Sequence, residues 1–582
     1  MDLITEHLDL WTSTIKAKKT TGRGSSKNRE LYGIKKLREL ILELAVRGLL
    51  VPQNPNDEPA SIQLERMIEE KETLEVKEKI RVIKPLTHSK LTKSFDIPCS
   101  WKLVNLPNVT YFQEGPGILA KDFRDSGIPL IRIAGMHSDT VSLNGCNYLE
   151  KEMVQEKWNH FKLDEGDILL SSSASLGKVS KVKSEAAGCI PYTGLIRFKP
   201  FKYLDEEFLT VVFKSNEFLR QINSSKKGAA IKHFGPTHLK KMSMSLPPLA
   251  EQKRIVVKVD ELMALCDQLE QQTEDQITTH ETLVKTLLDS LTSATADASQ
   301  FQQAWQQIET NFDLLFTTES SIDHLKQSIL QLAVMGKLVQ QDTNDEPASE
   351  LLNRIAAEKT RLINEKKLKK TKAPSPIDTA EEPFSLPLGW SWSYLGQTGI
   401  GATGKTPKTS NSANFGGDIE FIGPGQISPT GELSKPDKYL TEKGIKGSTE
   451  ALRGDILMVC IGGSIGKSVV SEQRIAFNQQ INAISPIHIS SEFLNSAVST
   501  DFFYRSVLEK STGSATPIIN RSKWENLLVP IPPLAEQHRI VAKVDELMAL
   551  CDTLKSTINS ANAIQLNLTD TVSNNYFKVI HD

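Results

Sequence analysis

The stretch LPPLAEQKRIVVKVDELMALCDQLE (Leu246–Glu270) returns late in the chain as IPPLAEQHRIVAKVDELMALCDTLK (Ile531–Lys555). Twenty of these 25 positions are identical, at an offset of 285 residues. A second segment, LRELILELAVRGLLVPQNPNDEPAS (Leu37–Ser61), returns as LKQSILQLAVMGKLVQQDTNDEPAS (Leu325–Ser349), with 16 of 25 positions identical. Solenoid repeats run about 20–50 residues, so this much longer period indicates a duplicated set of domains.

The repeated segments predict helices. Ala250–Leu291 reads as one long helix, because apolar residues such as Val259 and Cys266 follow a spacing of three and four. Prolines stand just before it, where a helix can begin. The other repeat reads as helix, stop, helix, with Gly48 and Gly336 as the stops.

The segments between the repeats predict mixed α/β domains, because short apolar runs there are bounded by turn residues. The predicted strands are IPLIRI (Ile128–Ile133), GDILLSS (Gly166–Ser172), GLIRFKP (Gly194–Pro200), IEFIG (Ile419–Gly423), GDILMVCIG (Gly454–Gly462) and INAISP (Ile481–Pro486). The two domains share GDIL and Gly-Lys signals but little else, so their ligands are expected to be different members of one class.

We therefore predict an α+β protein. Two α/β domains are separated by long antiparallel coiled-coil-like helices, and the duplication gives circular pseudo-two-fold symmetry. The predicted organisation is an N-terminal helical arm (1–95), a first mixed domain (96–245), a central repeated helical region (246–384), a second mixed domain (385–530) and a C-terminal repeated helix (531–582).

Composition sets the broad class. The 582 residues suggest about four domains, and 39% hydrophobic with 24% charged residues is ordinary for a soluble globular protein. No signal peptide or run of 18 apolar residues is evident. The six cysteines form no CxxC pair, which argues against zinc and disulfides and fits a cytoplasmic protein. Cys266 and Cys551 are expected in the core.

Catalytic motifs are absent. GGSIGKS (Gly462–Ser468) resembles a nucleotide-binding loop, but Ile461 stands where that motif needs its first glycine. No dinucleotide-type glycine pattern, metal cluster or nucleophile–base set has supporting context. We predict no catalytic site and no metal site.

Polar and basic loops predict a DNA face. Residues 221–254 hold seven Lys or Arg against one acid, a local charge of +6 in a chain of net charge −2. Asn and Gln can pair with adenine, Arg or Lys with guanine, and lysines can hold phosphates. The candidates are Arg132, Ser172, Ser173, Ser175, Lys178, Lys226, Lys227, Lys232, His233, Lys405, Thr406, Lys408, Gln426, Ser464, Lys467, Asn478, Gln479, Arg521 and Lys523.

The doubled PPLAEQ-x-RIV-x-KVDELMALCD motif closes each mixed domain and opens a long helix. YFQEGPGILAKDFRDSGIPLIR (Tyr111–Arg132) and GKTPKTSNSANFGGDIEFIGPGQ (Gly404–Gln426) look like openings of target recognition domains. Together these features resemble the specificity subunits of type I restriction-modification systems over about 37–570. The N-terminal extension resembles the longer-armed subgroup of that family.

The resemblance implies that each domain reads one half of a bipartite double-stranded DNA target, while the helices fix the unread spacer as a ruler. It also implies assembly with two modification subunits, which bind S-adenosylmethionine, and two restriction subunits, which use ATP and Mg. No cofactor and no catalysis are expected in this chain. The helix positions expected to bind partners are Leu262, Leu269, Leu547 and Leu554.

Two alternatives remain. A coiled-coil scaffold with protein-binding domains would not need the +6 segment or the Asn- and Gln-bearing loops. A DNA-binding module that borrows the fold, such as an anti-restriction protein, would fail to bind modification subunits.

Overall fold

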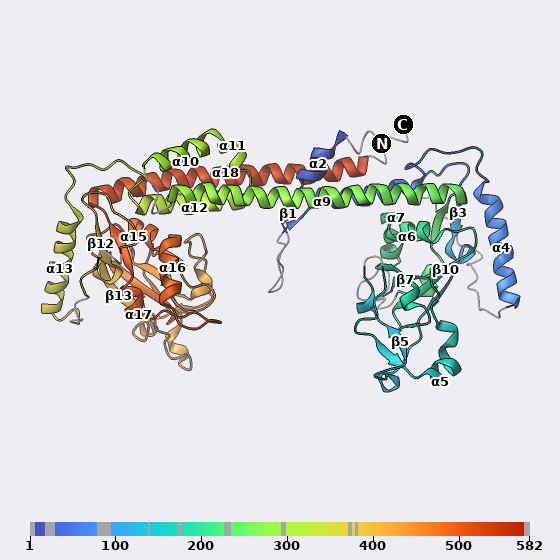
Figure 1. Ribbon diagram of the computed structural model, residues 1–582. Coiled ribbons are helices and arrows are strands. Elements are labelled where there is room, and N and C mark those ends of the chain that lie inside the picture. The colour runs from blue at the N-terminus through green and yellow to red at the C-terminus, as the bar shows by residue number, and fades with distance from the viewer. Residues whose placement is uncertain are drawn as a thin grey trace. The chain divides into compact units, whose positions relative to one another are not determined.

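The computed structural model describes residues 6–17, 29–77, 95–137, 140–172, 177–225, 234–292, 298–369, 375–378 and 382–575. The chain divides into two compact units (Figure 1). Unit 1 is Met1–Asp275 with Asn562–Asp582, and unit 2 is Gln276–Ala561. Each unit holds one mixed α/β domain and one pair of repeated helices, so the α+β class and the duplication are confirmed. The predicted boundaries between domains stay predictions.

Two long helices each belong to both units. Helix α9 (Leu249–Thr292, 44 residues) begins in unit 1 and ends in unit 2, whereas α18 (Leu534–Asn575, 42 residues) begins in unit 2 and ends in unit 1. Both are unbroken in Figure 1. The long helix predicted over Ala250–Leu291 is confirmed. None of the described helices is both long enough and apolar enough to cross a membrane.

The second repeat forms the predicted helix pairs, α3 (Tyr32–Arg47) with α4 (Ala60–Lys77) in unit 1, and α12 (Glu319–Val334) with α13 (Ala348–Asn364) in unit 2. Gly48 and Gly336 follow the first helix of each pair with φ of 75° and 67°. A Cβ atom there would come within 2.6 Å of Pro98 and 2.4 Å of Pro387. Both glycines are therefore required by backbone conformation and by close packing. Three short helices precede these pairs, α2 (Leu8–Ser13) in unit 1, and α10 (Ala298–Thr310) and α11 (Phe312–Leu315) in unit 2.

The mixed domain of unit 1 has an antiparallel four-stranded sheet with the order β4-β10-β7-β8. A three-stranded sheet, β6-β5-β9, contains one parallel pair, and β3 pairs with β11 near the long helix. The strands are β3 (Lys102–Asn105), β4 (Thr110–Glu114), β5 (Ile128–Ile131), β6 (Asn147–Leu149), β7 (Ile168–Ser171), β8 (Val179–Lys181), β9 (Ile190–Pro191), β10 (Leu195–Pro200) and β11 (Ser243–Leu246). Helices α6 (Glu206–Lys214) and α7 (Asn216–Ser224) complete the domain.

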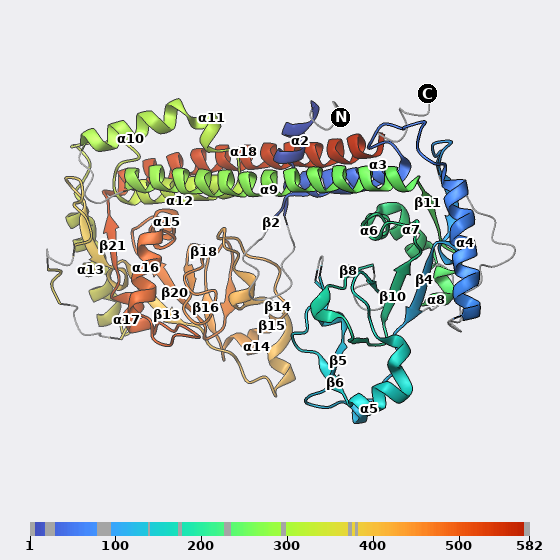
Figure 2. The same cartoon turned by 45° about the vertical axis from the view of Figure 1, so that its right-hand side comes forward.

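The mixed domain of unit 2 repeats this plan (Figure 2). Its sheets have the orders β13-β20-β17-β18, β15-β14-β19-β16 and β12-β21. The strands are β12 (Ser391–Tyr394), β13 (Gly399–Thr403), β14 (Phe415–Ile422), β15 (Tyr439–Leu440), β16 (Thr449–Ala451), β17 (Ile456–Val459), β18 (Ser468–Val470), β19 (Ile475–Phe477), β20 (Ile481–Pro486) and β21 (Leu528–Ile531). The helices are α15 (Ser491–Val498), α16 (Asp501–Lys510) and α17 (Arg521–Glu525). All six predicted strands are present.

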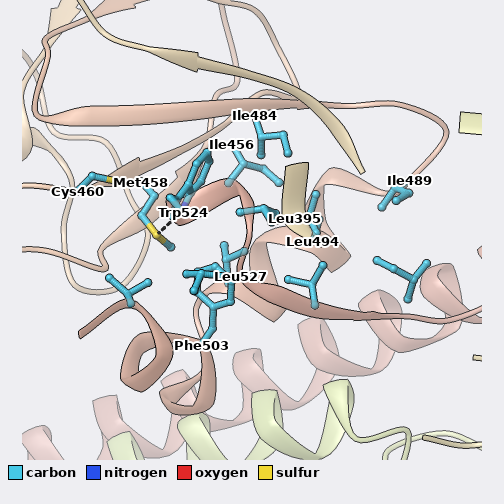
Figure 3. Close-up of a cluster of buried hydrophobic side chains, with 14 of the residues drawn as sticks. Leu395, Ile456, Met458, Cys460, Ile484, Ile489, Leu494, Phe503, Trp524 and Leu527 are labelled. Atoms are coloured by element: carbon cyan, nitrogen blue, oxygen red, sulfur yellow. Dashed lines mark hydrogen bonds between the residues drawn. The ribbon is translucent and has the colours of Figure 1, made fainter. Parts of the chain in front are cut away.

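The core of this second domain surrounds Trp524, which is fully buried (Figure 3). Strands β17 and β20 contribute Ile456, Met458 and Ile484, and Phe503 comes from α16. The indole N–H of Trp524 donates to Sδ of Met458 over 3.2 Å, so its one polar atom is satisfied inside the core. Cys266 and Cys551 are also buried, as predicted.

A buried polar cluster joins the two repeated segments in unit 1. Glu251, 1% exposed, accepts hydrogen bonds from Nε1 of Trp101 (3.0 Å) and from the side chain of Gln53. One turn later Arg254 pairs with Asp57 over 2.6 Å. Burial raises the pKa of the Glu251 carboxyl, while its two donors oppose that rise.

Unit 2 repeats the cluster. Glu536 accepts from Nε1 of Trp390 (2.9 Å) and from Nε2 of Gln341 (3.1 Å), and Arg539 pairs with Asp345 over 2.6 Å. Burial raises the pKa of Glu536 as well. The PPLAEQ-x-R and NDEPAS segments therefore recur together because each supplies the partner of the other.

The glutamine of the same motif fixes where each long helix meets its mixed domain. Gln252 donates to the carbonyl of Pro247 (2.9 Å) and accepts from the N–H of Asp205, the residue that caps α6. Gln537 makes the matching bonds to Pro532 and Ser490, each over 3.0 Å. Both glutamines are fully buried, so the long helix and the domain are held in one orientation within each unit.

We predict that Glu251→Gln or Glu536→Gln destabilises the unit that carries it by about 1–3 kcal/mol, because the new amide places a donor against a buried donor. Thermal unfolding followed by calorimetry measures the change. The matched controls are Glu261→Gln and Glu546→Gln, exposed glutamates on the same helices, which should shift the unfolding midpoint little. Equal shifts in the buried and exposed variants would contradict the prediction.

Candidate nucleic-acid interface

In each mixed domain, loops gather at one end of one four-stranded sheet. This sheet is β4-β10-β7-β8 in unit 1 and β13-β20-β17-β18 in unit 2. Neighbouring strands run in opposite directions, so in unit 2 β13 and β17 end where β20 and β18 begin. The loops at this place are 404–409, 460–467 and 478–480. The same argument brings together the described residues that directly follow β4 and β7 or directly precede β8 and β10 in unit 1. We call this part of each domain its loop end.

At the loop end of unit 2, Lys405, Thr406 and Gln479 are held together. The N–H of Lys405 donates to the carbonyl of Phe477 over 3.0 Å, and Oγ1 of Thr406 donates to Oε1 of Gln479 over 2.6 Å. Lys405 and Lys408 are exposed, and the described residues place no acid against either. The loop thus presents two free cations beside a side-chain amide whose oxygen is already fixed.

Gln426 and Asn478 lie side by side because the parallel strands β14 and β19 end together, with Ile422 paired to Phe477. Oε1 of Gln426 accepts from the N–H of Gly423 (3.0 Å), and Oδ1 of Asn478 accepts from the N–H of Gln480 (2.9 Å). Both side chains are half-exposed. Backbone donors therefore orient two side-chain amides at the surface, which is the arrangement that reading of a base edge requires.

The two lysines of the matched Gly-Lys signals hold loops in place. Lys467 donates to the carbonyl of Ile427 over 3.3 Å, and Lys178 donates to the carbonyl of Met136. Each acceptor follows the 3-10 turn after the equivalent strand, β14 or β5. The recurrence of Gly-Lys thus has a structural cause, while a DNA contact by either lysine stays a prediction.

In unit 1, Arg132 is exposed at the end of β5, and its guanidinium lies 5.8 Å from the ring centre of Tyr192. Its NH1 also donates to Oδ1 of Asn147 over 3.4 Å. The ring and the amide limit the directions in which the arginine can point. Ser172, in contrast, is 2% exposed, and its hydroxyl has no partner within the described part of the chain.

Tyr192 is the residue at this site that sequence reasoning missed. It follows Pro191, which pairs with Ile131 across parallel strands, just as Asn478 follows Phe477 in unit 2. Alignment of LIRFKP (Leu195–Pro200) with INAISP (Ile481–Pro486), at an offset of 286, would have placed Tyr192 and Asn478 at the same position.

The remaining candidates of unit 2 have mainly backbone partners. Ser464 is half-exposed in the loop after β17. Arg521 donates to the carbonyl of Gly401 and pairs with Glu525, each over 3.3 Å. Burial raises the pKa of Glu525, and the charge of Arg521 opposes this. Lys523 donates to the carbonyl of Lys510 over 3.0 Å.

Six candidates of unit 1 lie outside the described residues: Ser173, Ser175, Lys226, Lys227, Lys232 and His233. Their DNA contacts stay predictions, as do those of all the other candidates.

Three of the four leucines predicted to bind partners pack into the helical core. Leu262 is buried in unit 1, and Leu547 and Leu554 pack against the buried cluster of unit 2. Leu269 is half-buried. Leucines at another matched position, Leu265 and Leu550, are instead 49% and 59% exposed. The partner-binding role of the four predicted leucines stays a prediction.

Comparison with known proteins gives consistent matches. Residues 98–279 and 387–562 match the family model described as "Type I restriction modification DNA specificity domain". The specificity subunit of the type I restriction enzyme EcoAI from Escherichia coli is 36% identical, with 98% of each chain covered. That of EcoEI, also from Escherichia coli, is 36% identical over the same shares. A solved chain from a type I R-M system covers 83% of this chain at 18% identity, with a TM-score of 0.45.

We predict different effects from two substitutions at the loop end of unit 2. Lys405→Ala should weaken binding to all DNA sequences, because a lysine contacts phosphate. It should also reduce the slope of log affinity against log salt concentration by about one, which corresponds to one released counterion. Gln479→Ala should cost about 1–3 kcal/mol on the cognate half-site alone, because an amide reads a base edge.

Fluorescence anisotropy against salt, on cognate and scrambled duplexes, measures both effects. The control is Lys543→Ala, which removes a lysine paired with Glu546 on α18 and should change neither value. Wild-type values for both loop variants would contradict the placement of the interface.

Proposed function

Because this chain belongs to the type I restriction modification DNA specificity family, we propose that it reads a two-part DNA sequence, one half with each mixed domain. The observation that carries the proposal is that each mixed domain has a loop end of its own, built on an equivalent sheet. Both domains keep the same four-stranded sheet, and in each a lysine, Lys178 or Lys467, holds the equivalent backbone carbonyl, yet their exposed residues differ. One framework with two sets of surface side chains suits two different half-sites. The protein-binding scaffold is not favoured, because the family match covers both domains.

In the second domain, the orienting bonds suit base readout. Gln426, Asn478 and Gln479 each have an oxygen fixed by a neighbouring donor. We propose that their amides contact adenine edges, while Lys405 and Lys408 hold phosphates. The two roles are then divided between loops that different strands position.

In the first domain, Arg132 is the corresponding reader. The ring of Tyr192 and the amide of Asn147 restrain its guanidinium. A restrained, exposed guanidinium suits the two acceptors of a guanine edge.

We propose that the chain directs chemistry without performing it. The fold and the sequence supply binding surfaces, and the adenine methylation and DNA cleavage would come from partner subunits. S-adenosylmethionine would then belong to two modification subunits, and ATP with Mg to two restriction subunits, with no cofactor in this chain. The assembly would act on DNA in the cytoplasm.

The long helices are proposed to set the spacer between the half-sites and to bind the modification subunits. Because three of the four predicted leucines pack inward, we propose Leu265 and Leu550 as the apolar contacts. Each is exposed, and each lies in the nearly identical segment of its own unit. The same partner could therefore bind twice.

Replacement of residues 96–245 by the matching domain of another family member should change one half of the target and leave the other half unchanged. Co-expression with the modification subunit, followed by single-base mapping of methylated adenines, gives the result. Wild type should yield two short blocks around a fixed spacer. A change in both blocks would reject the modular reading, and the absence of methylation by a stable wild-type complex would reject the proposed function.

Leu265→Glu and Leu550→Glu should each weaken the binding of a modification subunit by at least about tenfold, because a charge would enter an apolar contact. Both should leave DNA half-site preference unchanged. Titration with the modification subunit by calorimetry measures the affinity. Leu314→Glu alters a leucine that is 71% exposed outside the repeated segment and is the control. Equal affinities in all three variants would exclude this face as the docking site.

A further inference from the structure

The last part of α18, residues 562–575, belongs to unit 1 and is here called the α18 tail. Over 562–574 the buried side chains are those of Thr569 and Ser573, which are 0% and 8% exposed. Both carry hydroxyl groups. The apolar side chains of this range are at most half-buried, as Leu566 and Val572 are. The α18 tail therefore meets unit 1 through buried polar groups rather than through an apolar core.

The equivalent part of α9 is held in a different way. At the offset of 285 residues, Thr569 matches Val284 and Ser573 matches Leu288. Val284 and Leu288 are 1% and 2% exposed, and they belong to the apolar cluster that α9 forms with α10, α11 and α12 in unit 2. Because apolar burial is the dominant favourable term in folding, the end of α9 is secured more firmly than the α18 tail.

The N-terminal residues 6–17, here called the α2 segment, provide a partner for the tail. Helix α2 lies beside the end of α18 in both views (Figures 1 and 2). The hydroxyl of Thr14, a residue that is 1% exposed, donates to the carbonyl of Leu10 over 2.7 Å. It therefore accepts from the hydroxyl of Thr569, which lies 2.9 Å away. One buried hydroxyl pair thus joins the start of the chain to its last helix.

Further polar contacts surround this pair. The hydroxyl of Tyr32, at the start of α3, donates to Oδ1 of Asp570 over 2.7 Å. The ammonium of Lys36 lies 3.8 Å from the same carboxylate oxygen. Nε2 of Gln565 donates to the hydroxyl of Ser13 over 3.4 Å. The α18 tail is therefore linked to the α2 segment and to α3 by hydrogen bonds and one longer ion pair.

The α2 segment is itself fixed to α3. Trp11 is fully buried, and the N–H of Gly33 donates to the carbonyl of Thr14 over 3.0 Å. A Cβ atom at Gly33 would come within 2.2 Å of the carbonyl oxygen of Trp11. The segment thus has a defined seat, from which Thr14 is presented to the tail.

The chain passes between the two units twice, once within α9 and once within α18. Release of the α18 tail would leave α9 as the one link that is secured at both ends. A single helix bends and twists more readily than two helices that are each secured at both ends. We propose that the α2 segment is a clasp for the α18 tail, and that this clasp determines how strictly the spacer length is read. The proposal rests on the proposed function, in which the long helices set the spacer.

Amide hydrogen exchange of the full chain, followed by mass spectrometry, tests the clasp. The release variant combines Thr14→Ala with Tyr32→Phe, which removes two contacts and leaves α18 unchanged. Exchange over 562–575 should rise at least about fivefold, because a buried hydroxyl loses its partner and the tail opens more often. Exchange over 534–555 should stay at the wild-type rate.

Two further variants are the controls for this experiment. Thr12→Ala removes a hydroxyl of α2 whose bonds lie within its own helix, so exchange of the tail should not change. Thr14→Val combined with Thr569→Val replaces both partners of the buried pair by groups of similar shape. Such a replacement can be nearly neutral, so the tail should keep its wild-type protection. Wild-type exchange of the tail in the release variant would overturn the clasp.

Methylation of a target library tests the effect on the spacer. The library keeps both half-sites and varies the spacer between them, and the full chain is used in complex with the modification subunit. Wild type and the valine pair should methylate targets with one spacer length. The release variant should keep the same half-sites but also methylate targets whose spacer is one base pair longer or shorter.

The outcomes separate the clasp from the proposed function. A released tail with an unchanged single spacer would overturn the link to spacer reading. If the release variant methylates no target, the milder Thr14→Ala variant decides between one spacer length and several. Absence of methylation by a stable wild-type complex would reject the proposed function, and the exchange experiment would still decide the clasp.

Discussion

A buried carboxylate at the start of each long helix is the interaction on which the rest of the structure depends. Glu251 and Glu536 lie buried, away from water. An uncompensated charge in such a place costs free energy. Each is compensated by an indole N–H and a glutamine amide from separate segments. The tryptophan begins the mixed domain and the glutamine follows the first repeated helix. A single acid thus fixes three parts of the fold, and loss of either donor leaves one carboxylate oxygen without its hydrogen bond.

This constraint explains why the two halves differ where they do. The helix starts and the helix–stop–helix segments supply each other's hydrogen-bond partners, so a change in one demands a change in the other. The loop ends have no such mutual requirement, because their orienting bonds lie within one or two neighbouring loops. Side chains there can vary while the strands beneath them stay. Lys178 and Lys467 mark the boundary between the constant strands and the variable loops, since both lie in variable loops but hold equivalent backbone carbonyls.

The helical junctions show that duplication need not keep identical chemistry. Glu43 completes its own cluster in unit 1, whereas in unit 2 Gln331 lines a cavity, and Arg505 makes no ion pair with the residues that the structure describes. The surrounding helices keep their places because their apolar faces, such as Ile329 and Leu332 on α12, still pack. Apolar packing therefore carries the fold at this junction, while its polar groups differ between the two units.

By itself the sequence determined the duplication, because its repeated segments can be compared directly. It also determined the long helices, the glycine stops and the six strands, because apolar spacing and turn chemistry depend on neighbouring residues. Only the tertiary structure decided which polar residues pair with each other, and which apolar residues face the core or the solvent. Arg254, counted in the basic segment, pairs with Asp57, which lies 197 positions earlier. The spacing of Leu262 marked an apolar stripe, and long-range packing turned that stripe inward and left Leu265 exposed. Local spacing defines the faces of a helix, but the partner of each face is chosen by residues hundreds of positions away.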